Sequence, residues 1–215
     1  MAEFDFERSI PIFASIIAFA LGSVPFGLIV ARVFKGKDIT KHGSGNIGAT
    51  NVSRVLGFWP AGALTLFLDI GKGTLAVFLV HPFGVFLWGK SQLLSGYEFS
   101  TFSVWLVGLF AVLGHCYSPW LHFKGGKGVA TGLGTVLLLS PIAAAAGIAA
   151  FIITFFSKRT GSLASIAGLL VASTTHVVFE PVGAHLWLGA IMVFIILLRH
   201  ESNITALLEN RENTF

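Results

Sequence analysis

Charged side chains are scarce in this sequence. Asp, Glu, Lys and Arg make up 11% of the 215 residues, whereas hydrophobic residues make up 54%. A soluble domain usually carries about twice that charged fraction. The apolar residues also form runs longer than a buried helix of a soluble protein needs, and the mean hydropathy is +0.83. The composition therefore predicts an integral membrane protein and excludes a disordered chain, a collagen and a coiled coil.

Cysteine is nearly absent as well. The single Cys116 cannot form an internal disulfide, and no second thiol or close group of histidines has the spacing of metal ligands. We therefore expect neither a metal nor an organic cofactor. The net charge of +4 comes from 14 basic and 10 acidic residues. The basic residues lie in short loops between apolar spans, so we expect no nucleic acid partner.

Six apolar runs are long enough to be membrane-spanning segments. They cover residues 10–34, 58–80, 102–117, 129–156, 163–179 and 185–198. The fourth run would be about 42 Å of straight helix at about 1.5 Å per residue, and Ser140-Pro141 interrupts it. We divide it into a short helix, 129–139, and a longer helix that begins at Pro141, where a missing N–H costs little. Because residues 1–9 are acidic, we interpret the first run as a retained helix and not a signal peptide.

The distribution of positive charge favours seven spans over six. Seven spans with an outside N-terminus put eleven of the 14 Lys and Arg on the inner side, with Arg8 and Lys90 outside and Lys72 within a span. Six spans would place the last basic residues opposite the first two basic loops. The predicted fold is therefore all-α, with seven transmembrane helices, one of them short, and a cytoplasmic C-terminus. No linker or repeat divides the chain, so we expect one integral-membrane domain, 1–215, in which 1–9 are a short extension.

The segment GSGNIGATNVSR, at 43–54, is rich in glycine and small polar residues. It contains G-x-G-x-x-G, but it follows a membrane helix and not a strand, so a dinucleotide site lacks its structural context. Closely spaced glycines can direct consecutive N–H groups into one concavity that suits a phosphate, and an arginine can add a two-pronged contact. A tight turn before a helix cap explains the segment equally well. The candidate binding residues are Gly43, Ser44, Gly45, Asn46, Thr50, Asn51 and Arg54.

A second glycine-rich segment, 124–128, opens the short helix. Its two lysines frame glycines at a helix N-terminus, where dipole, amides and ammonium groups attract an anion together. Lysines that only mark the membrane interface would explain the charges but not the glycines. The Walker spacing is absent. The candidate residues are Lys124, Gly125, Gly126, Lys127 and Gly128.

Two further groups of polar residues are candidates. Asp69 and Lys72 are three residues apart inside the second span, so they can simply pair, but intramembrane charges are often functional, and Lys72 is the one more suited to an anion. Near the C-terminus, His200 and Asn203 lead into an apolar stripe that predicts a short helix on the membrane surface. His115 is a possible supporting group near the second loop.

In this order, the segments resemble the PlsY family, the membrane acyl-phosphate:glycerol-3-phosphate acyltransferases of bacteria. SGNIGATN at 44–51, DIGKG at 69–73 and FKGGKGVAT at 123–131 carry the resemblance, and GSVPFG, SLASI and RHESN also match. It covers the chain from about Leu21 onward and implies seven spans in the bacterial inner membrane with a cytoplasmic active site. It also implies acyl transfer to the 1-hydroxyl of glycerol 3-phosphate, which yields lysophosphatidate and phosphate in the first acylation of phospholipid synthesis. The residues implicated are Ser44, Arg54, the Lys-Gly-Gly-Lys segment, His200 and Asn203.

Two substrates with phosphates require two neighbouring anion sites. We expect the amides of 43–46 and Ser44 to hold the acyl phosphate, with catalytic roles for Ser44, His200 and Asn203. Glycerol 3-phosphate would bind at Arg54, Lys124 or Lys127, Lys72 and Asn203. His200 is the best candidate for the base, and the substrate's own phosphate is its rival.

Other functions fit less well. The H-x-x-x-x-D pattern of thioester-using acyltransferases is absent, which disfavours coenzyme A as donor. A transporter of a phosphorylated small metabolite is the alternative, but transporters usually show two related halves. Besides substrates and membrane lipid, we expect no obligate protein partner.

Overall fold

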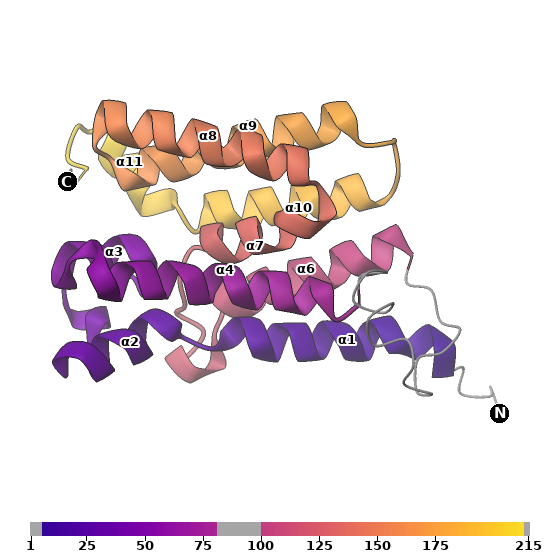
Figure 1. Ribbon diagram of the computed structural model, residues 1–215, viewed down its shortest axis with the longest axis horizontal. Helices are drawn as coiled ribbons and strands as arrows, with labels where there is room; N and C mark the ends of the chain where they lie inside the picture. The colour runs from indigo at the N-terminus through magenta and orange to yellow at the C-terminus, as the bar shows by residue number, and fades with distance from the viewer. Residues whose placement is uncertain (1–5, 81–99, 213–215) are drawn as a thin grey trace.

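The computed structural model describes residues 6–80 and 100–212, and every regular element in these two ranges is helical. Figure 1 shows long helices that run side by side, with α1 starting at the right and α11 lying at the left. In chain order the α-helices are α1 (Phe6–Ser23), α2 (Phe26–Lys35), α3 (Ala49–Leu56), α4 (Ala63–Phe78), α6 (Thr101–Cys116), α7 (Val129–Leu139), α8 (Pro141–Lys158), α9 (Gly161–Phe179), α10 (His185–Leu198) and α11 (Glu201–Leu208). Three single-turn elements, η1 (Ile39–Lys41), η2 (Phe58–Gly62) and η3 (Pro119–Leu121), lie in the connections.

Five helical segments in the described ranges are long and apolar enough to cross a membrane. They are Ile10–Lys35, Phe58–Phe78, Thr101–Leu121, Pro141–Lys158 and Gly161–Phe179. A sixth span results if α10 and α11, which meet at a 59° bend, are counted together, and α7 is a shorter apolar helix. The all-helical prediction is confirmed for the described chain. The count of seven and the orientation of the termini stay predictions, and Lys90 lies outside the described residues.

The predicted division of the fourth run is confirmed: α7 ends at Leu139, and α8 begins at Pro141. The first run, by contrast, is broken. α1 ends at Ser23 and α2 begins at Phe26, because Pro25 has no N–H to donate and disfavours helical geometry at Val24. The break leaves backbone carbonyls that other groups must satisfy.

Small residues bring neighbouring helices into close contact. A Cβ atom added to Gly73 of α4 would lie 2.1 Å from the Thr131 carbonyl oxygen of α7, and one on Gly134 would lie 2.0 Å from the Ile70 oxygen. Gly22 packs in the same way against Ala111. Such contacts are typical of helices that associate within a bilayer, where packing replaces the hydrophobic effect.

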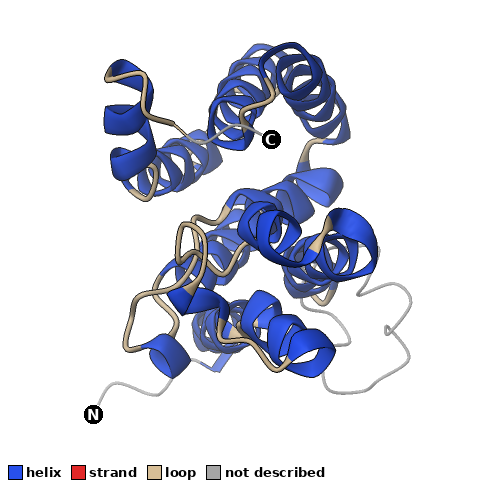
Figure 2. Cartoon of the chain, turned by 90° about the vertical axis from the view of Figure 1, so that its left-hand side faces the viewer, coloured by secondary structure: helices blue, strands red, loops and turns tan. Residues whose placement is uncertain are grey.

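Viewed end-on, the helices form two groups (Figure 2). The upper group contains α8, α9, α10 and α11, and the lower group contains α1, α2, α3, α4 and α6, with α7 between them (Figure 1). Residues of both groups line a cavity between them.

Candidate active site

Two cavities meet between the helix groups. The larger, of about 930 Å³, runs between the α4–α7 side and α8, α9 and α10, and its deep walls are apolar. The smaller, of about 370 Å³, lies between the glycine loops and the start of α11. Both are lined by Ser44, Asn46, Lys127 and Asn203. These four residues therefore mark a polar junction at the mouth of an apolar cavity.

Most predicted site residues lie at these cavities, although they are far apart in sequence. The lining residues among them are Ser44, Gly45, Asn46, Thr50, Asn51, Arg54, Gly125, Lys127, Gly128, His200 and Asn203. Four described candidates line neither cavity: Gly43, Lys72, Lys124 and Gly126. The predicted convergence of the two glycine loops with the C-terminal segment is thus found in the structure.

The first glycine loop is folded around the buried side chain of Asn51. The Asn51 amide group donates to the carbonyl oxygens of His42 (3.0 Å) and Asn46 (2.8 Å), and its Oδ1 accepts from the Ser44 N–H (2.9 Å). Gly43 and Gly45 have φ values of +59° and +71°, which favour glycine. The loop glycines therefore serve this tight turn.

This geometry limits which loop amides can hold a phosphate, because two of the predicted amides of 43–46 are already bonded within the loop. The Ser44 N–H is donated to Asn51, the Gly45 N–H to His42, and the Gly48 N–H to Asn46 Oδ1. Because an N–H makes one good hydrogen bond, these groups are not available to a phosphate. The exposed side chain of Ser44, which lines both cavities, remains the loop's candidate for substrate contact.

The second glycine loop is held from both sides. The N–H groups of Gly125 and Gly126 donate to the last carbonyls of α6, those of Cys116 (3.1 Å) and His115 (3.0 Å). The Gly125 and Gly126 carbonyls accept from Arg199, at 2.8 Å and 3.1 Å. A Cβ atom on either glycine would lie 2.1 Å from His115. These glycines therefore allow a close approach, and Arg199 fixes the loop to the end of α10.

The two lysines of this loop differ in their surroundings. Lys124 is exposed and lies away from both cavities. Lys127 points into the junction, where its Nζ donates to Asn203 Oδ1. Burial is the main cause that lowers the pKa of Lys127 to about 8, and the charges of Arg54 and Arg199 lower it further. Of these two lysines, Lys127 is therefore the one placed to meet an anion in the cavities.

His200 lies between α10 and α11, directly before Glu201, and is 2% exposed. Its Nδ1 lies 2.7 Å from the Ile196 carbonyl oxygen, which can only accept, so Nδ1 carries the proton and Nε2 is the basic nitrogen. Burial lowers the pKa of His200 to about 4. The imidazole is therefore neutral at pH 7 and can accept a proton.

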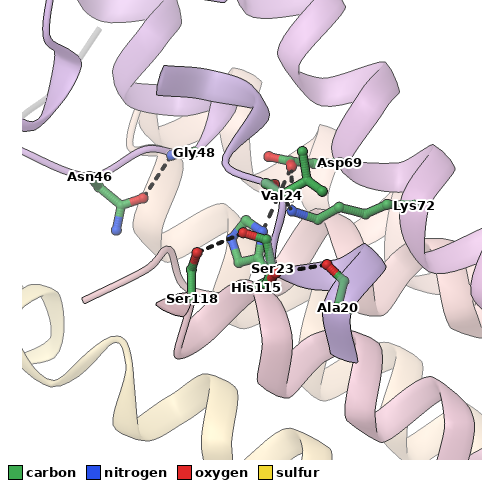
Figure 3. A network of polar contacts seen from close by, with 9 residues as sticks. All are labelled: Ala20, Ser23, Val24, Asn46, Gly48, Asp69, Lys72, His115 and Ser118. Atoms are coloured by element: carbon green, nitrogen blue, oxygen red, sulfur yellow. Dashed lines mark hydrogen bonds and ion pairs between the residues drawn. The ribbon is translucent and has the colours of Figure 1, made fainter. Parts of the chain in front are cut away.

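Lys72 belongs to a buried network (Figure 3), of which Asp69 and His115 line the large cavity. Its Nζ lies 2.9 Å from Asp69 Oδ1 and donates to the Val24 carbonyl at 3.0 Å, and His115 Nδ1 lies 3.7 Å from the same Asp69 oxygen. Ser118 donates to the Ser23 carbonyl at 2.6 Å. The carbonyls freed by the break between α1 and α2 are satisfied in this way. The pairing of Asp69 with Lys72 that their spacing allows is therefore present. Lys72 lines neither cavity, whereas Asp69 and His115 line the large one, so the DIGKG motif borders that cavity through Asp69.

Three residues at the site were not predicted to have a role there. Arg199 was not among the candidate residues, although it clamps the second glycine loop. Ser162 at the start of α9 and Glu212 after α11 also line the large cavity and bond to each other at 2.7 Å. Ser162 lies within the matching SLASI segment, which was the available signal. Glu212 gave no signal, since nothing in a tail of mixed polar residues indicates that it folds back.

Comparison with known proteins identifies the family. A model of a family described as glycerol-3-phosphate acyltransferase matches residues 12–210. The chain belongs to this family. A glycerol-3-phosphate acyltransferase of Zymomonas mobilis is 40% identical over 202 residues, which cover 92% of each chain. One from Helicobacter pylori is 36% identical and covers 97% of this chain and 96% of its own.

Solved structures agree with the sequence relatives. The crystal structure of PlsY, an integral membrane glycerol 3-phosphate acyltransferase, in its glycerol 3-phosphate form superposes with a TM-score of 0.82 at 37% identity, over 95% of both chains. The lysophosphatidic acid form gives a TM-score of 0.80. Our chain is therefore an acyltransferase and a membrane protein, and the resemblance in its motifs is confirmed.

Proposed function

We propose that the chain transfers a fatty acyl group from acyl phosphate to the 1-hydroxyl of glycerol 3-phosphate. The observation that carries this proposal is the junction of the two cavities, where Ser44, Lys127 and Asn203 meet at the mouth of a long apolar space. An acyl chain suits the apolar walls, and phosphates suit the polar mouth. Relatives named glycerol-3-phosphate acyltransferase support the acceptor.

In the proposed reaction the substrate hydroxyl attacks the carbonyl carbon of the mixed anhydride. A new C–O ester bond forms, the bond between the carbonyl carbon and the phosphate oxygen breaks, and inorganic phosphate leaves. His200 Nε2 takes the hydroxyl proton. Lys127 and Arg54 hold phosphate by charge, and Asn203 orients the ammonium of Lys127.

The two substrates approach the junction from different surroundings. The acyl chain enters the large cavity from the lipid, because the space between α8, α9 and α10 and the α4–α7 side has apolar walls. Glycerol 3-phosphate enters through the smaller cavity near Arg199 and Asn203. We assign the glycine loops and α11 to the cytoplasmic side of the bacterial inner membrane, in line with the basic residues that lie there.

The test compares two acyl donors, an acyl phosphate and an acyl thioester. Purified protein receives labelled glycerol 3-phosphate with either palmitoyl phosphate or palmitoyl-CoA, and lysophosphatidate and released phosphate are measured. We expect equal amounts of both products with palmitoyl phosphate and none of the lipid with palmitoyl-CoA. Lysophosphatidate formed only from the thioester would overturn the proposed donor. Uptake of labelled glycerol 3-phosphate into proteoliposomes without acylation would overturn the activity in favour of a transporter.

A further inference from the structure

The C-terminal tail returns to the site after α11. Glu212 lines the large cavity, and its Oε1 accepts two hydrogen bonds, from Ser162 Oγ at 2.7 Å and from Asn203 Nδ2 at 2.8 Å. On its other side, the Asn203 amide accepts from Lys127 through Oδ1. A continuous chain of polar contacts thus joins the tail, the start of α9, α11 and the second glycine loop.

We propose that Glu212 is a positioning residue of the acyltransferase site, which fixes the orientation of the Asn203 amide and, through it, the place of the Lys127 ammonium. The inference rests on the proposed function, since Lys127 and Asn203 are assigned there to substrate phosphate.

The donors and acceptors allow one arrangement of these groups. An ammonium can only donate and an ionised carboxylate can only accept, whereas an amide has one end of each kind. Asn203 therefore must turn Oδ1 to Lys127 and Nδ2 to Glu212. Without an acceptor at position 212, the amide can rotate so that two donors face each other at Lys127, and a neutral acceptor holds Nδ2 less strongly than a carboxylate does.

The charges around Lys127 support the same positioning role for Glu212. The charged groups that face Lys127 are Glu212, which raises its pKa, and Arg54 and Arg199, which lower it. Lys127 in turn lowers the pKa of His200. Glu212 opposes burial and the two arginines, so it helps Lys127 to stay charged. In a variant without this carboxylate, the pKa of Lys127 should fall below the wild-type value of about 8.

The test compares Glu212→Gln with Glu209→Gln in the full-length protein. Glu209 is an exposed residue of the same tail that pairs with Arg211, so it is a matched control. We expect Glu212→Gln, which keeps an acceptor but removes the charge, to raise the KM for glycerol 3-phosphate about tenfold, with a much smaller change in kcat. The alkaline fall of kcat/KM, near pH 8 in the wild type because Lys127 loses its proton there, should move to lower pH.

A tail residue that only anchors the chain would behave differently. Glutamine can still accept from Ser162 and Asn203, so an anchor would leave the pH profile unchanged. Glu212→Asp, which keeps the charge, should restore the profile toward that of the wild type. Equal KM values and equal pH profiles for Glu212→Gln and Glu209→Gln would overturn the inference. Failure of the wild type to acylate glycerol 3-phosphate in the same assay would instead overturn the proposed function.

Discussion

One of the two ring nitrogens of His200 already makes a hydrogen bond. Its Nδ1–H donates to the Ile196 carbonyl, which sets the tautomer and leaves Nε2 as the basic nitrogen at the wall of the large cavity. A glutamine has no nitrogen that can accept a proton near neutral pH. Replacing His200 with glutamine therefore removes the proposed general base.

We expect His200→Gln to lower kcat about a hundredfold, because general base catalysis contributes at least that factor. The KM for glycerol 3-phosphate should change little. His42→Gln is the control, since His42 is exposed, lines neither cavity, and has its Nδ1 2.9 Å from the Asp38 carbonyl oxygen. Near-normal turnover of His200→Gln would exclude His200 as the base and favour the substrate's own phosphate.

At the scale of single helices, the packing of α4 on α7 explains one of the two glycines in the DIGKG segment. Gly71 and Gly73 both lie in α4, but only Gly73 faces α7, where a Cβ atom would lie 2.1 Å from the Thr131 carbonyl oxygen. A Cβ atom on Gly71 would meet nothing within 4 Å. The two glycines therefore form a matched pair.

We predict that Gly73→Ala destabilises the protein by about 1–3 kcal/mol or more, because the helices must move apart to admit the methyl group. Gly71→Ala should be neutral or stabilising by about 0.5–1 kcal/mol, since alanine is the better helix former. Thermal unfolding in detergent micelles measures both. Equal melting temperatures for the two variants would contradict the close packing of α4 on α7.

The long helices were predictable from the sequence, but the way they meet was not. Apolar runs and Ser140-Pro141 predicted the observed bounds of α7 and α10 and the observed start of α8, because hydrophobic length and proline act locally. Pro25 is itself a sequence signal for the break between α1 and α2. The sequence does not show that the freed Val24 carbonyl accepts from Lys72, 48 residues later. Pairings over such distances depend on packing that one sequence does not reveal.

The candidate site, too, was predictable from the sequence only in part. Residue types and glycine patterns predicted which segments converge, and eleven of the predicted residues line the two cavities. They did not predict what the glycines do, since the loop amides bind Asn51 and the end of α6. Arg199 and Glu212 were missed as site residues because their partners lie on other elements.

For the whole molecule, orientation in the membrane is testable at two ends. Lys37, between α2 and η1, and Val182, between α9 and α10, are both exposed, Val182 by 97%. Cys116 is buried, so the native thiol gives little background. In spheroplasts, an impermeant maleimide should label Val182→Cys directly and Lys37→Cys only after permeabilisation. The opposite pattern would reverse the proposed orientation.

The proposed activity depends on the junction where the two glycine loops, α10 and α11 converge. Lys127 and Lys124 belong to one short loop, but only Lys127 reaches that junction. The most direct measurement is calorimetric titration of glycerol 3-phosphate into the wild type, Lys127→Ala and Lys124→Ala. We predict an affinity about tenfold or more weaker for Lys127→Ala and within about threefold of the wild type for Lys124→Ala, as expected for an exposed charge. Equal losses in both variants, or a larger loss for Lys124→Ala, would contradict the site described above.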